Sequence, residues 1–374
     1  MRVVHIIKVT GIAGAEQHLI TLLSGLRDQQ IDACIILLVE PDNRMDNYIA
    51  ALNARQVPAQ AIVIRHHADV TLISRLHTAL EALAPDIVHT HLIHADLYGA
   101  LATRGIKVPI ISSRHNDDAF RYRAPVRLVN RMLWRMTSKG IAISDAIARF
   151  SIEIEGAKPE QIQRIHYGLD TAIAPLNRTE TKRKLTAELK LPADSQLIGM
   201  VCRLIEQKGV RYGLEAFIQL ADKFPKAHLL IAGKGLLLLE LEERTKEAGL
   251  SSRVHFLGWR SDAPVLMAGL DILLAPSLWE GFGLVMLEAM AQQTPIVASR
   301  VSAIPEVVSD RETGLLVEPK DVEGLKDALS KLLKDSALRQ HMGLMGRDRL
   351  ETHFSAIRMV KETIELYHTI TDGI

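Results

Sequence analysis

Residues 271–292 read DILLAPSLWEGFGLVMLEAMAQ. The first six residues form a short, mostly apolar run, typical of a buried strand, and after Gly283 the apolar residues recur at helical spacing. The stretch therefore predicts a strand, a tight Gly-Phe-Gly loop and the start of a helix. Glycine at 281 and 283 lets the backbone approach a ligand closely. A helix N-terminus offers free N–H groups and a partial positive charge, which suit a phosphate.

Two glutamates flank this loop, Glu280 on the loop itself and Glu288 inside the predicted helix. Eight residues of continuous helix would separate them by about 12 Å along the axis. This is too far for the carboxylate pair of a retaining glycoside hydrolase, which is about 5 Å apart. We interpret the two glutamates as separate contacts for two parts of an extended ligand. Two solvated surface glutamates would give the same pattern, since glutamate is mostly a surface residue.

The composition is that of a soluble globular protein. The chain has 374 residues, 48% hydrophobic and 24% charged, and this length favours two domains. A net charge of +1 gives no electrostatic reason to expect nucleic acid as a partner. No apolar run reaches the length of a membrane span, and the N-terminal MRVVHIIKVT enters a strand pattern without a signal-peptide cleavage site.

The two cysteines, Cys34 and Cys202, lie far apart in apolar, strand-like runs. They predict buried free thiols and a reducing, cytoplasmic location. No Cys/His spacing indicates a zinc site.

Strand-like and helix-like segments alternate along the chain. The predicted strands of the first half are 3–9, 34–39, 61–64, 86–89, 109–112, 140–143 and 163–166; those of the second half are 197–201, 228–232, 254–257, 271–275, 295–298 and 315–317. This alternation favours an α/β protein with parallel sheets covered on both faces. The alternation of strand-like and helix-like segments is interrupted at 168–195. We therefore expect two doubly wound, Rossmann-like domains at 1–170 and 171–354. A helix at about 355–374 is expected to pack back on the first domain. In such folds, ligands bind beyond the carboxyl ends of the strands, here in a cleft between the domains.

Polar motifs follow several of these strands. The first strand leads into KVTGIAGAE (8–16), and the first strand of the second half leads into VCRLIEQKG (201–209). Two other strands end in His89-Thr-His91 and in SSRHN (112–116), and AGKG (232–235) and HFLG (255–258) end two more. Since no GxGxxG follows the first strand and no P-loop is present, nicotinamide-dependent and ATP-hydrolysing functions are disfavoured.

Taken together, these motifs identify a family resemblance. The two glutamates in EGFGLVMLEAMA, with seven residues between them, resemble the signature of the family-four retaining glycosyltransferases (glycosyl transferases group 1), which have the GT-B fold. The resemblance extends from the first loop to about Val317 and is denser in the second half. It implies a nucleotide-sugar donor as substrate, retention of anomeric configuration, no catalytic metal and no cofactor.

The resemblance also implies roles for individual residues. Gly14 and Glu16 match a loop that lies against the donor diphosphate and sugar, and His115 takes the position of a histidine that faces the donor sugar. Glu280 would meet the sugar hydroxyls, and Glu288 the ribose hydroxyls. The remaining donor-binding candidates are Arg203, Lys208, Gly233, Phe256, Leu257, Phe282, Gly283 and Leu284. His89 and His91 also lie at the end of a strand, where ligands of such sheets bind, and their role is left open.

Arg203 and Lys208 match the two cations that hold the diphosphate. As the glycosidic bond breaks, negative charge accumulates on the leaving diphosphate, and fixed cations stabilise that transition state more than the ground state. Glu280, His115, Arg203 and Lys208 are therefore the catalytic candidates. The sequence departs from the family pattern at Ala13, Cys202 and Gln293, where glycine is usual, and at Ser302-Ala303, where a pair of glycines is frequent.

Residues 125–139 predict a basic amphipathic helix. Arg127, Arg131, Arg135 and Lys139 recur every four residues, and Leu128, Val129, Met132, Leu133 and Met136 form the other face. Such a helix suits an anionic membrane surface or an anionic acceptor. An ordinary domain helix with a solvated basic stripe has the same pattern, because packing on a sheet also requires an apolar face.

These observations predict a retaining glycosyltransferase that moves a sugar from a UDP- or GDP-linked donor to a hydroxyl acceptor. We expect this acceptor to be a glycan or lipid-linked molecule in cell-surface polysaccharide, lipopolysaccharide or lipid-linked glycan assembly. The expected location is cytoplasmic, with peripheral attachment to the inner face of the plasma membrane if the basic helix binds lipid. A nucleotide-sugar 2-epimerase and a non-catalytic nucleotide-sugar-binding protein remain alternatives.

Overall fold

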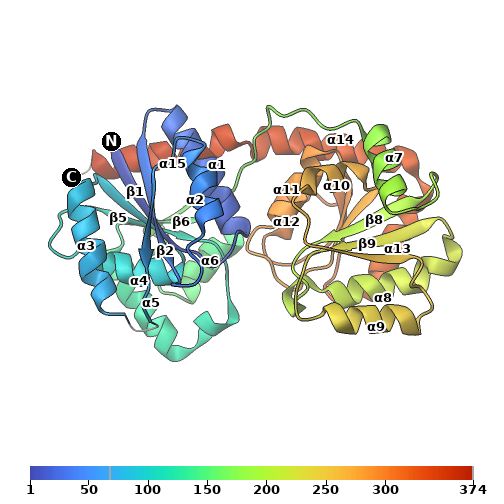
Figure 1. Cartoon of the computed structure of the whole chain (residues 1–374), viewed down its shortest axis with the longest axis horizontal. Helices are drawn as coiled ribbons and strands as arrows, with labels where there is room; N and C mark the ends of the chain where they lie inside the picture. The colour runs from blue at the N-terminus through green and yellow to red at the C-terminus, as the bar shows by residue number, and fades with distance from the viewer. Residues whose placement is uncertain (67–68, 373–374) are drawn as a thin grey trace. The chain divides into compact units, whose positions relative to one another are not determined.

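The computed structural model describes residues 1–66 and 69–372 and divides into two compact units (Figure 1). Unit 1 comprises Met1–Asp170 and Ser355–Ile374, and unit 2 comprises Thr171–Phe354. Each unit is a parallel sheet with helices on both faces, which confirms the predicted fold class of two Rossmann-like domains. Among the described residues, no helix combines the length and apolar character that a membrane span requires.

Unit 1 contains a seven-stranded sheet in the order β3-β2-β1-β4-β5-β6-β7. Its strands are β1 (Arg2–Lys8), β2 (Asp32–Val39), β3 (Ala59–Val63), β4 (Ile87–His91), β5 (Ile110–Arg114), β6 (Lys139–Ala142) and β7 (Ile162–Arg164). Its helices are α1 (Gly14–Asp28), α2 (Asp46–Asn53), α3 (Thr71–Leu83), α4 (Leu92–Ala102), η1 (Ala119–Tyr122), α5 (Ala124–Met136), α6 (Asp145–Glu153), η2 (Pro159–Gln161) and α15 (Ala356–Thr371).

The side chains of β1 alternate between the two faces of this sheet. Val3 and Ile7 pack in a core with α1 and α15, whereas Val4 and Ile6 pack in a second core with α3 and α4. Parallel strands that are buried on both faces read as continuous apolar runs, and this explains why the strands are visible in the sequence.

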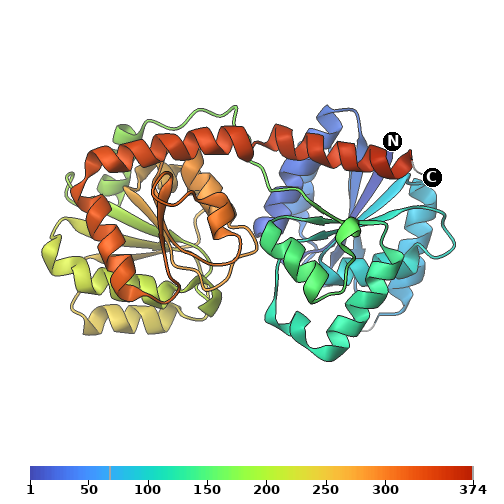
Figure 2. The same ribbon diagram turned by 180° about the vertical axis from the view of Figure 1, so that it is seen from behind.

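The last helix of the chain, α15, belongs to unit 1 and packs beside α1 (Figures 1 and 2). The chain leaves unit 1 after Asp170 and returns at Ser355. The Ala356 N–H donates to the carbonyl of Leu169 (2.7 Å), and a Cβ at Gly168 would lie only 2.4 Å from the Ser355 carbonyl oxygen. The exit and the return of the chain are therefore in direct backbone contact.

Unit 2 contains a six-stranded sheet in the order β10-β9-β8-β11-β12-β13. Its strands are β8 (Gln196–Val201), β9 (Ala227–Ala232), β10 (Val254–Gly258), β11 (Ile272–Ala275), β12 (Ile296–Ser299) and β13 (Gly314–Val317). Its helices are α7 (Arg178–Glu188), η3 (Glu206–Lys208), α8 (Val210–Leu220), η4 (Ala221–Lys223), α9 (Leu238–Glu247), α10 (Ala263–Gly269), α11 (Leu284–Ala291), α12 (Ile304–Val307), α13 (Val322–Lys334) and α14 (Ser336–His353).

In both sheets the order of the strands reverses at one point. This switch point lies between β1 and β4 in unit 1 and between β8 and β11 in unit 2. The connections after the two central strands diverge there, and ligands of open α/β sheets bind in the crevice that this leaves. Cys34, buried on β2, and Cys202, partly buried after β8, are both free thiols, as predicted.

Candidate functional site

The loops after β8 and β11 meet at the switch point of unit 2. The first loop carries Arg203 and Lys208, and the second carries Glu280. The Lys208 ammonium forms an ion pair with the Glu280 carboxylate, and these side chains are only 15% and 12% exposed. The fold thus joins two of the candidate donor-binding residues, which lie 72 positions apart in the sequence.

Arg203 lies exposed to solvent on the same loop as Lys208. Its guanidinium donates to the side-chain oxygen of Gln207 (3.2 Å), and the Gln207 amide donates to the backbone carbonyl of Trp279 (3.3 Å). Within the described part of the chain, no acidic side chain pairs with Arg203. The guanidinium is therefore oriented but keeps donors available for an anionic ligand.

Two glycines allow the loops of unit 2 to touch. Gly209 has φ +59°, and a Cβ there would lie 1.9 Å from the Pro276 carbonyl oxygen. Gly233 has φ +145°, and a Cβ there would lie 1.8 Å from the Cys202 carbonyl oxygen. A side chain at either position would collide with backbone and strain it. The loops after β8, β9 and β11 are consequently held together by close backbone contact.

The loop that contains Glu280 ends at Gly283, which caps α11 with φ +89°. The Ser277 hydroxyl lies 3.3 Å from the Glu280 carboxylate, and the Phe282 ring is buried against Phe354. The buried ring anchors the loop, and α11 then starts at Leu284 with N–H groups that no earlier turn can use. Because the helix starts only at Leu284, the separation of 12 Å predicted for continuous helix does not apply to Glu280 and Glu288.

Glu288 lies in the second turn of α11 and is partly buried. Loss of solvent raises the pKa of its carboxyl to about 7. This carboxyl therefore changes charge near neutral pH, unlike an ordinary surface glutamate. Phe256 and Leu257 lie on β10 and are also partly buried, and the Gly233 N–H donates to the Gly258 carbonyl at the end of that strand (2.7 Å).

In unit 1, Gly14 is exposed at the first position of α1, and Glu16 is buried one turn into the same helix. The Glu16 carboxylate accepts the backbone N–H of Ala13 (2.9 Å), and the Tyr48 hydroxyl donates to the Glu16 carbonyl (2.8 Å). Glu16 thus holds the loop after β1 in place through its own side chain and backbone.

His115 follows β5 and is only 8% exposed. Its Nε2 lies 3.0 Å from Nδ1 of His91, and its Nδ1 is hydrogen-bonded to the Tyr167 hydroxyl. Burial, with the nearby Arg121 and Arg114 guanidinium groups, lowers the pKa of His115 to about 3. The imidazole is neutral, and contact with a donor sugar would have to replace one of these two hydrogen bonds.

The sequence did not reveal two residues beside His115, His18 and Tyr167, or His5, which reaches it through His91. His18 of α1 stacks on Tyr167 with ring centroids 4.1 Å apart, and His5 of β1 bonds to His91 (2.9 Å). His18 follows Glu16 on the same helix, so its place beside the candidate loop was a signal that could have been used. Tyr167 and His5 lie inside apolar runs, where nothing local marks them.

A buried ionic cluster supports the end of β5. Arg114 pairs with Asp96 and Glu155, and Arg121 also pairs with Glu155; all four side chains are almost fully buried. Burial alone would raise the pKa of Glu155, but the two guanidinium groups lower it below its usual value. Removing one partner of such a cluster would leave an uncompensated buried charge, so the cluster fixes the backbone that leads into His115.

The helix α5 differs from a helix that simply packs on a sheet. Leu133 and Trp134 are buried, but Leu128 and Met132 are 61% and 55% exposed, and Val129 is also exposed. The prediction that these apolar residues form one face is therefore only partly right, because the packing is supplied by Asn130, Leu133 and Trp134. Arg131 and Arg135 are exposed as well, and the partly buried Arg127 donates to the Ile154 carbonyl (3.3 Å).

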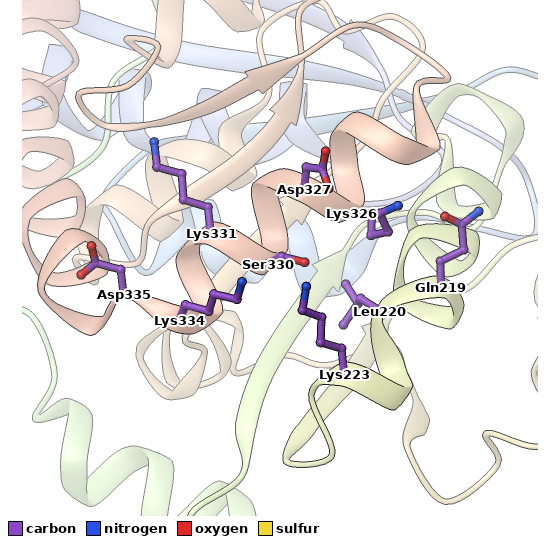
Figure 3. Close-up of a pocket in the computed structure, with 9 residues that line it drawn as sticks. All are labelled: Gln219, Leu220, Lys223, Lys326, Asp327, Ser330, Lys331, Lys334 and Asp335. Carbon is purple, nitrogen blue, oxygen red and sulfur yellow. The ribbon is translucent and has the colours of Figure 1, made fainter.

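A groove on unit 2 lies at the end of its sheet where the strands begin (Figure 3). It is formed by the end of α8, by η4 and by α13, with lining residues Gln219, Leu220, Lys223, Lys326, Asp327, Ser330, Lys331, Lys334 and Asp335. Helices that follow parallel strands end at the amino edge of the sheet, and Gln196 at the start of β8 donates to the Leu333 carbonyl there (2.8 Å). The groove is therefore remote from the loops at the carboxyl ends of the strands.

Two of the departures from the family pattern fall on left-handed backbone, whereas Ala13 (φ −127°) and Ala303 (φ −82°) do not. Gln293 has φ +55° and Ser302 has φ +44°. This explains why glycine is usual at both positions, since only glycine adopts such angles without strain. The loops keep that conformation here with other residues.

Two family models match the chain. The model described as Glycosyltransferase Family 4 matches residues 12–173, and the model described as Glycosyl transferases group 1 matches residues 181–349. The two matches correspond to the two units and together cover most of the chain.

Known proteins resemble the chain over nearly its full length. A UDP-Gal:alpha-D-GlcNAc-diphosphoundecaprenol alpha-1,3-galactosyltransferase from Escherichia coli is 27% identical over 98% of this chain and 96% of its own length. An N-acetyl-alpha-D-glucosaminyl L-malate synthase from Bacillus anthracis is 28% identical over 81% of this chain and 79% of its own length.

The solved structure of Anabaena HepE in complex with UDP and glucose superimposes with a TM-score of 0.88. It covers 99% of this chain and 100% of its own, at 22% identity. The chain is therefore a member of the group 1 glycosyltransferases of family four, and it has the GT-B fold.

Proposed function

We propose that this protein is a retaining glycosyltransferase that transfers a sugar from a UDP- or GDP-linked donor to a hydroxyl acceptor, without a catalytic metal. The observation that carries the proposal is the cluster of Arg203, Lys208 and Glu280 at the switch point of unit 2. The exposed guanidinium and the mostly buried ammonium can bind the diphosphate, and the carboxylate paired with the ammonium can accept hydrogen bonds from the sugar.

In the proposed reaction, the bond between the anomeric carbon and the diphosphate breaks, and its electron pair stays on the diphosphate. Arg203 and Lys208 stabilise this charge, helped by the N-terminus of α11. The acceptor oxygen attacks the anomeric carbon on the same face, and the acceptor proton passes to the leaving diphosphate. Glu280 accepts hydrogen bonds from the sugar hydroxyls, and its ion pair with Lys208 fixes both groups before the donor arrives.

UDP is the favoured nucleotide within this proposal. The galactosyltransferase relative is named for a UDP-linked donor, and the HepE structure contains UDP. Glu288 supports a ribose contact, because a partly desolvated carboxylate is a strong acceptor for paired hydroxyls.

A thermal-shift series with UDP, GDP, ADP and CMP tests the donor site. A ligand at about a hundredfold over its Kd adds about 2.7 kcal/mol of stability, which raises Tm by several degrees. We expect UDP to give this shift in the wild type and in Lys334→Ala, which removes a cation from the opposite edge of the same sheet. Arg203→Ala should abolish the shift, and an unchanged shift would remove Arg203 from the site.

Product analysis then separates transfer from the alternatives. The bound nucleotide sugar is incubated with and without lipid-linked and glycan acceptors. A 2-epimerase would convert the donor with no acceptor, and a non-catalytic binder would leave it unchanged. Loss of transfer in Glu280→Gln, with the UDP-induced shift in Tm retained, would support the role of Glu280 at the sugar.

For the acceptor, we propose a lipid-linked molecule reached from the inner face of the plasma membrane. Leu128, Val129 and Met132 are exposed on α5 next to Arg131 and Arg135. Phe120 and Tyr122, just before α5, are exposed too. Apolar side chains enter the headgroup region, and arginines attract anionic lipids at about 1 kcal/mol each.

Liposome flotation tests this surface. The triple change of Arg127, Arg131 and Arg135 to Gln should release the protein from phosphatidylglycerol vesicles. The matched control changes Lys326, Lys331 and Lys334 to Gln, which removes the same charge from the groove of unit 2. Equal binding by the two triple variants, or no binding by the wild type, would contradict the membrane proposal.

A further inference from the structure

A row of polar side chains crosses one face of the sheet in unit 1. Because strand residues alternate between faces, His5 of β1 and both histidines of β4 point to the same face, which is otherwise apolar and covered by α1 and α15. The register places His5 beside His89, and His91 beside Ser113 of β5. The three histidines are fully buried.

These side chains form one unbroken series of hydrogen bonds, which we call the histidine chain. Its bonded pairs, in order, are Tyr167 Oη–His115 Nδ1 (2.5 Å), His115 Nε2–His91 Nδ1 (3.0 Å), His91 Nε2–His5 Nδ1 (2.9 Å), His5 Nε2–Tyr367 Oη (3.3 Å), Tyr367 Oη–His89 Nδ1 (2.7 Å) and His89 Nε2–Ser113 Oγ (2.8 Å). Each of the four imidazoles uses both of its nitrogens. The chain therefore links the neighbourhood of Glu16, through three strands, to the last helix.

The chemistry of neutral imidazole restricts the protons of the histidine chain. A neutral ring has one N–H donor and one acceptor nitrogen, and a hydroxyl has one donor and two acceptor lone pairs. The bonds that join His115, His91, His5 and Tyr367 are then satisfied only if the three rings carry the proton on the same nitrogen, Nε2 in one arrangement and Nδ1 in the other. His89 shares this nitrogen in the Nδ1 arrangement, whereas in the Nε2 arrangement the Tyr367 oxygen can either donate to its Nδ1 or accept from it. If one of the three rings took the other tautomer, two donors or two acceptors would face each other.

Burial keeps the histidine chain neutral. Loss of solvent lowers the pKa of His5 to about 3, and the pKa values of His89 and His91 also lie well below the usual range. An added proton would give one ring two N–H donors. The hydrogen bonds on the two sides of that ring would then have to donate in opposite directions along the chain. The protons of the rings are therefore coupled rather than independent.

A metal ion is the other occupant to consider. One ring nitrogen from each of His5, His89 and His91 lies within 4.8 Å of the others, a spacing that could suit a metal. The planes of His5 and His91 differ by only 10°, however, and their facing nitrogens are 2.9 Å apart. A lone pair directed at a neighbouring N–H is not available to a metal. The hydrogen bonds account for all six nitrogens without one.

We propose that the histidine chain sets the tautomer of His115, and that His91, His5 and Tyr367 are positioning residues for glycosyl transfer. This inference rests on the proposed function, in which His115 lies on the donor side. If a sugar hydroxyl replaces Tyr167 at Nδ1 of His115, the order of the chain decides whether this nitrogen accepts or donates the new hydrogen bond. A side chain on α15, three bonds away, thus controls what His115 offers to the substrate.

Nitrogen NMR of protein with ¹⁵N-labelled histidine tests the order directly, whatever the activity. The signals of His5, His89, His91 and His115 are assigned with single variants. We expect all four rings to be neutral between about pH 6 and 8, and His5, His91 and His115 to share one tautomer. Different tautomers among these three rings, or titration of any of the four in this range, would overturn the proposal.

A pair of variants on α15 tests the coupling to His115. Tyr367→Phe removes the hydroxyl that bridges His5 and His89. Thr363→Val removes another buried hydroxyl from the same helix, but that group donates to the Met359 carbonyl (2.8 Å) and, among the described residues, has no bond to the histidine chain. We expect Tyr367→Phe alone to shift the His115 signals and to lower kcat about tenfold, with the KM for the acceptor changed less than about twofold. Identical spectra and rates for both variants would refute the coupling.

Two conservative changes at His91 provide a rescue test. Asparagine places its amide where Nδ1 faces His115, whereas glutamine places its amide where Nε2 faces His5. We expect His91→Asn to keep more of kcat than His91→Gln, because it keeps the bond to His115. The reverse order would show that His91 does not act through His115.

The failures of the two proposals can be told apart. A wild-type protein that transfers no sugar would end the proposed function, while the NMR result would still decide whether the histidine chain exists. Addition of Zn²⁺ supplies the remaining outcome. If one equivalent shifts the signals of His5, His89 and His91 together and raises Tm, the site binds metal and the histidine chain is disproved.

Discussion

Mild acid should unfold unit 1 before unit 2. Unit 1 buries five imidazoles whose pKa values lie far below the ordinary value of 6.5, namely those of His5, His18, His89, His91 and His115. Below about pH 6.5 the unfolded chain binds protons that the folded unit cannot. The stability that these groups contribute is therefore complete above this pH and is lost as the pH falls towards their folded pKa values.

The size of the effect follows from the number of rings. Each buried imidazole costs about 1.4 kcal/mol per pH unit below about 6.5. At about pH 5 this is about 2 kcal/mol for each ring and about 10 kcal/mol for the five, comparable to the total stability of a typical domain, about 5–15 kcal/mol. In the described part of unit 2, burial lowers the pKa of two imidazoles, that of His228 to about 4 and that of His255 in the same direction. Glu288 opposes them, because its raised pKa of about 7 means that the folded unit takes up a proton in this range. Unit 2 should therefore lose less stability than unit 1.

Tryptophan fluorescence can follow unit 1 separately. Of the three tryptophans, only Trp134 lies in unit 1, where it is buried. The variant with Trp259→Phe and Trp279→Phe therefore reports unit 1 during urea unfolding at a series of pH values. We expect the unfolding free energy to fall with a slope that corresponds to uptake of four or five protons.

The variant His89→Gln is the matched control, since it removes one of the five imidazoles. Its slope should correspond to one proton fewer. Uptake of a single proton on unfolding predicts a certain change in the unfolding free energy of unit 1 between about pH 7 and 5. If the measured change is no larger than this, these histidines are not buried as neutral rings.

Three further perturbations test the site in unit 2. Gly209→Ala would place a Cβ 1.9 Å from the Pro276 carbonyl oxygen. It should therefore lower the unfolding free energy measured in urea by about 3 kcal/mol and abolish the UDP-induced shift in Tm. An unchanged urea midpoint would disprove the close contact. Gln293→Gly and Ser302→Gly relieve left-handed backbone and should each add about 0.5–1 kcal/mol, visible as a higher Tm, whereas a lower Tm would argue against this strain. Since the Glu288 carboxyl has a pKa of about 7, UDP affinity by calorimetry should rise about tenfold from pH 6 to 8 as this group ionises, and the same rise in Glu288→Gln would assign it to another group.

The strands could be predicted because their signal is local. A parallel strand buried on both faces is a short apolar run between helices, and the structure has a strand for every predicted run in both units. The loops after the strands could be predicted too, because Gly209, Gly233 and Gly283 mark places where only glycine fits the backbone.

The sequence was less informative about α5. Periodicity shows which residues share a helical face, but it does not show what covers that face. The apolar residues Leu128 and Met132 are exposed, and the buried positions include the polar Asn130. Asn130 is buried because its amide donates to Glu155 (3.2 Å), part of an ionic cluster that no local pattern reveals.

The histidine chain was beyond sequence analysis for a related reason. Its bonds join β1, β4, the end of β5 and α15, and the bond between Tyr367 and His5 spans 362 residues. Only the register of the sheet and the packing of α15 bring these rings together. The ion pair between Lys208 and Glu280 likewise depends on the adjacency of β8 and β11.

The packing of α15 on unit 1 has a consequence during synthesis of the protein on the ribosome. The ribosome synthesises the segment Met1–Asp170 first, then Thr171–Phe354, and only then Ser355–Ile374. At about 5–20 residues per second, roughly 10–40 s separate the two parts of unit 1 during synthesis. Throughout that delay, the apolar face that Met359, Leu366 and Tyr367 later cover is exposed. The unit whose synthesis begins first is thus completed only after unit 2 has been made, and until then its apolar face lacks the cover of α15.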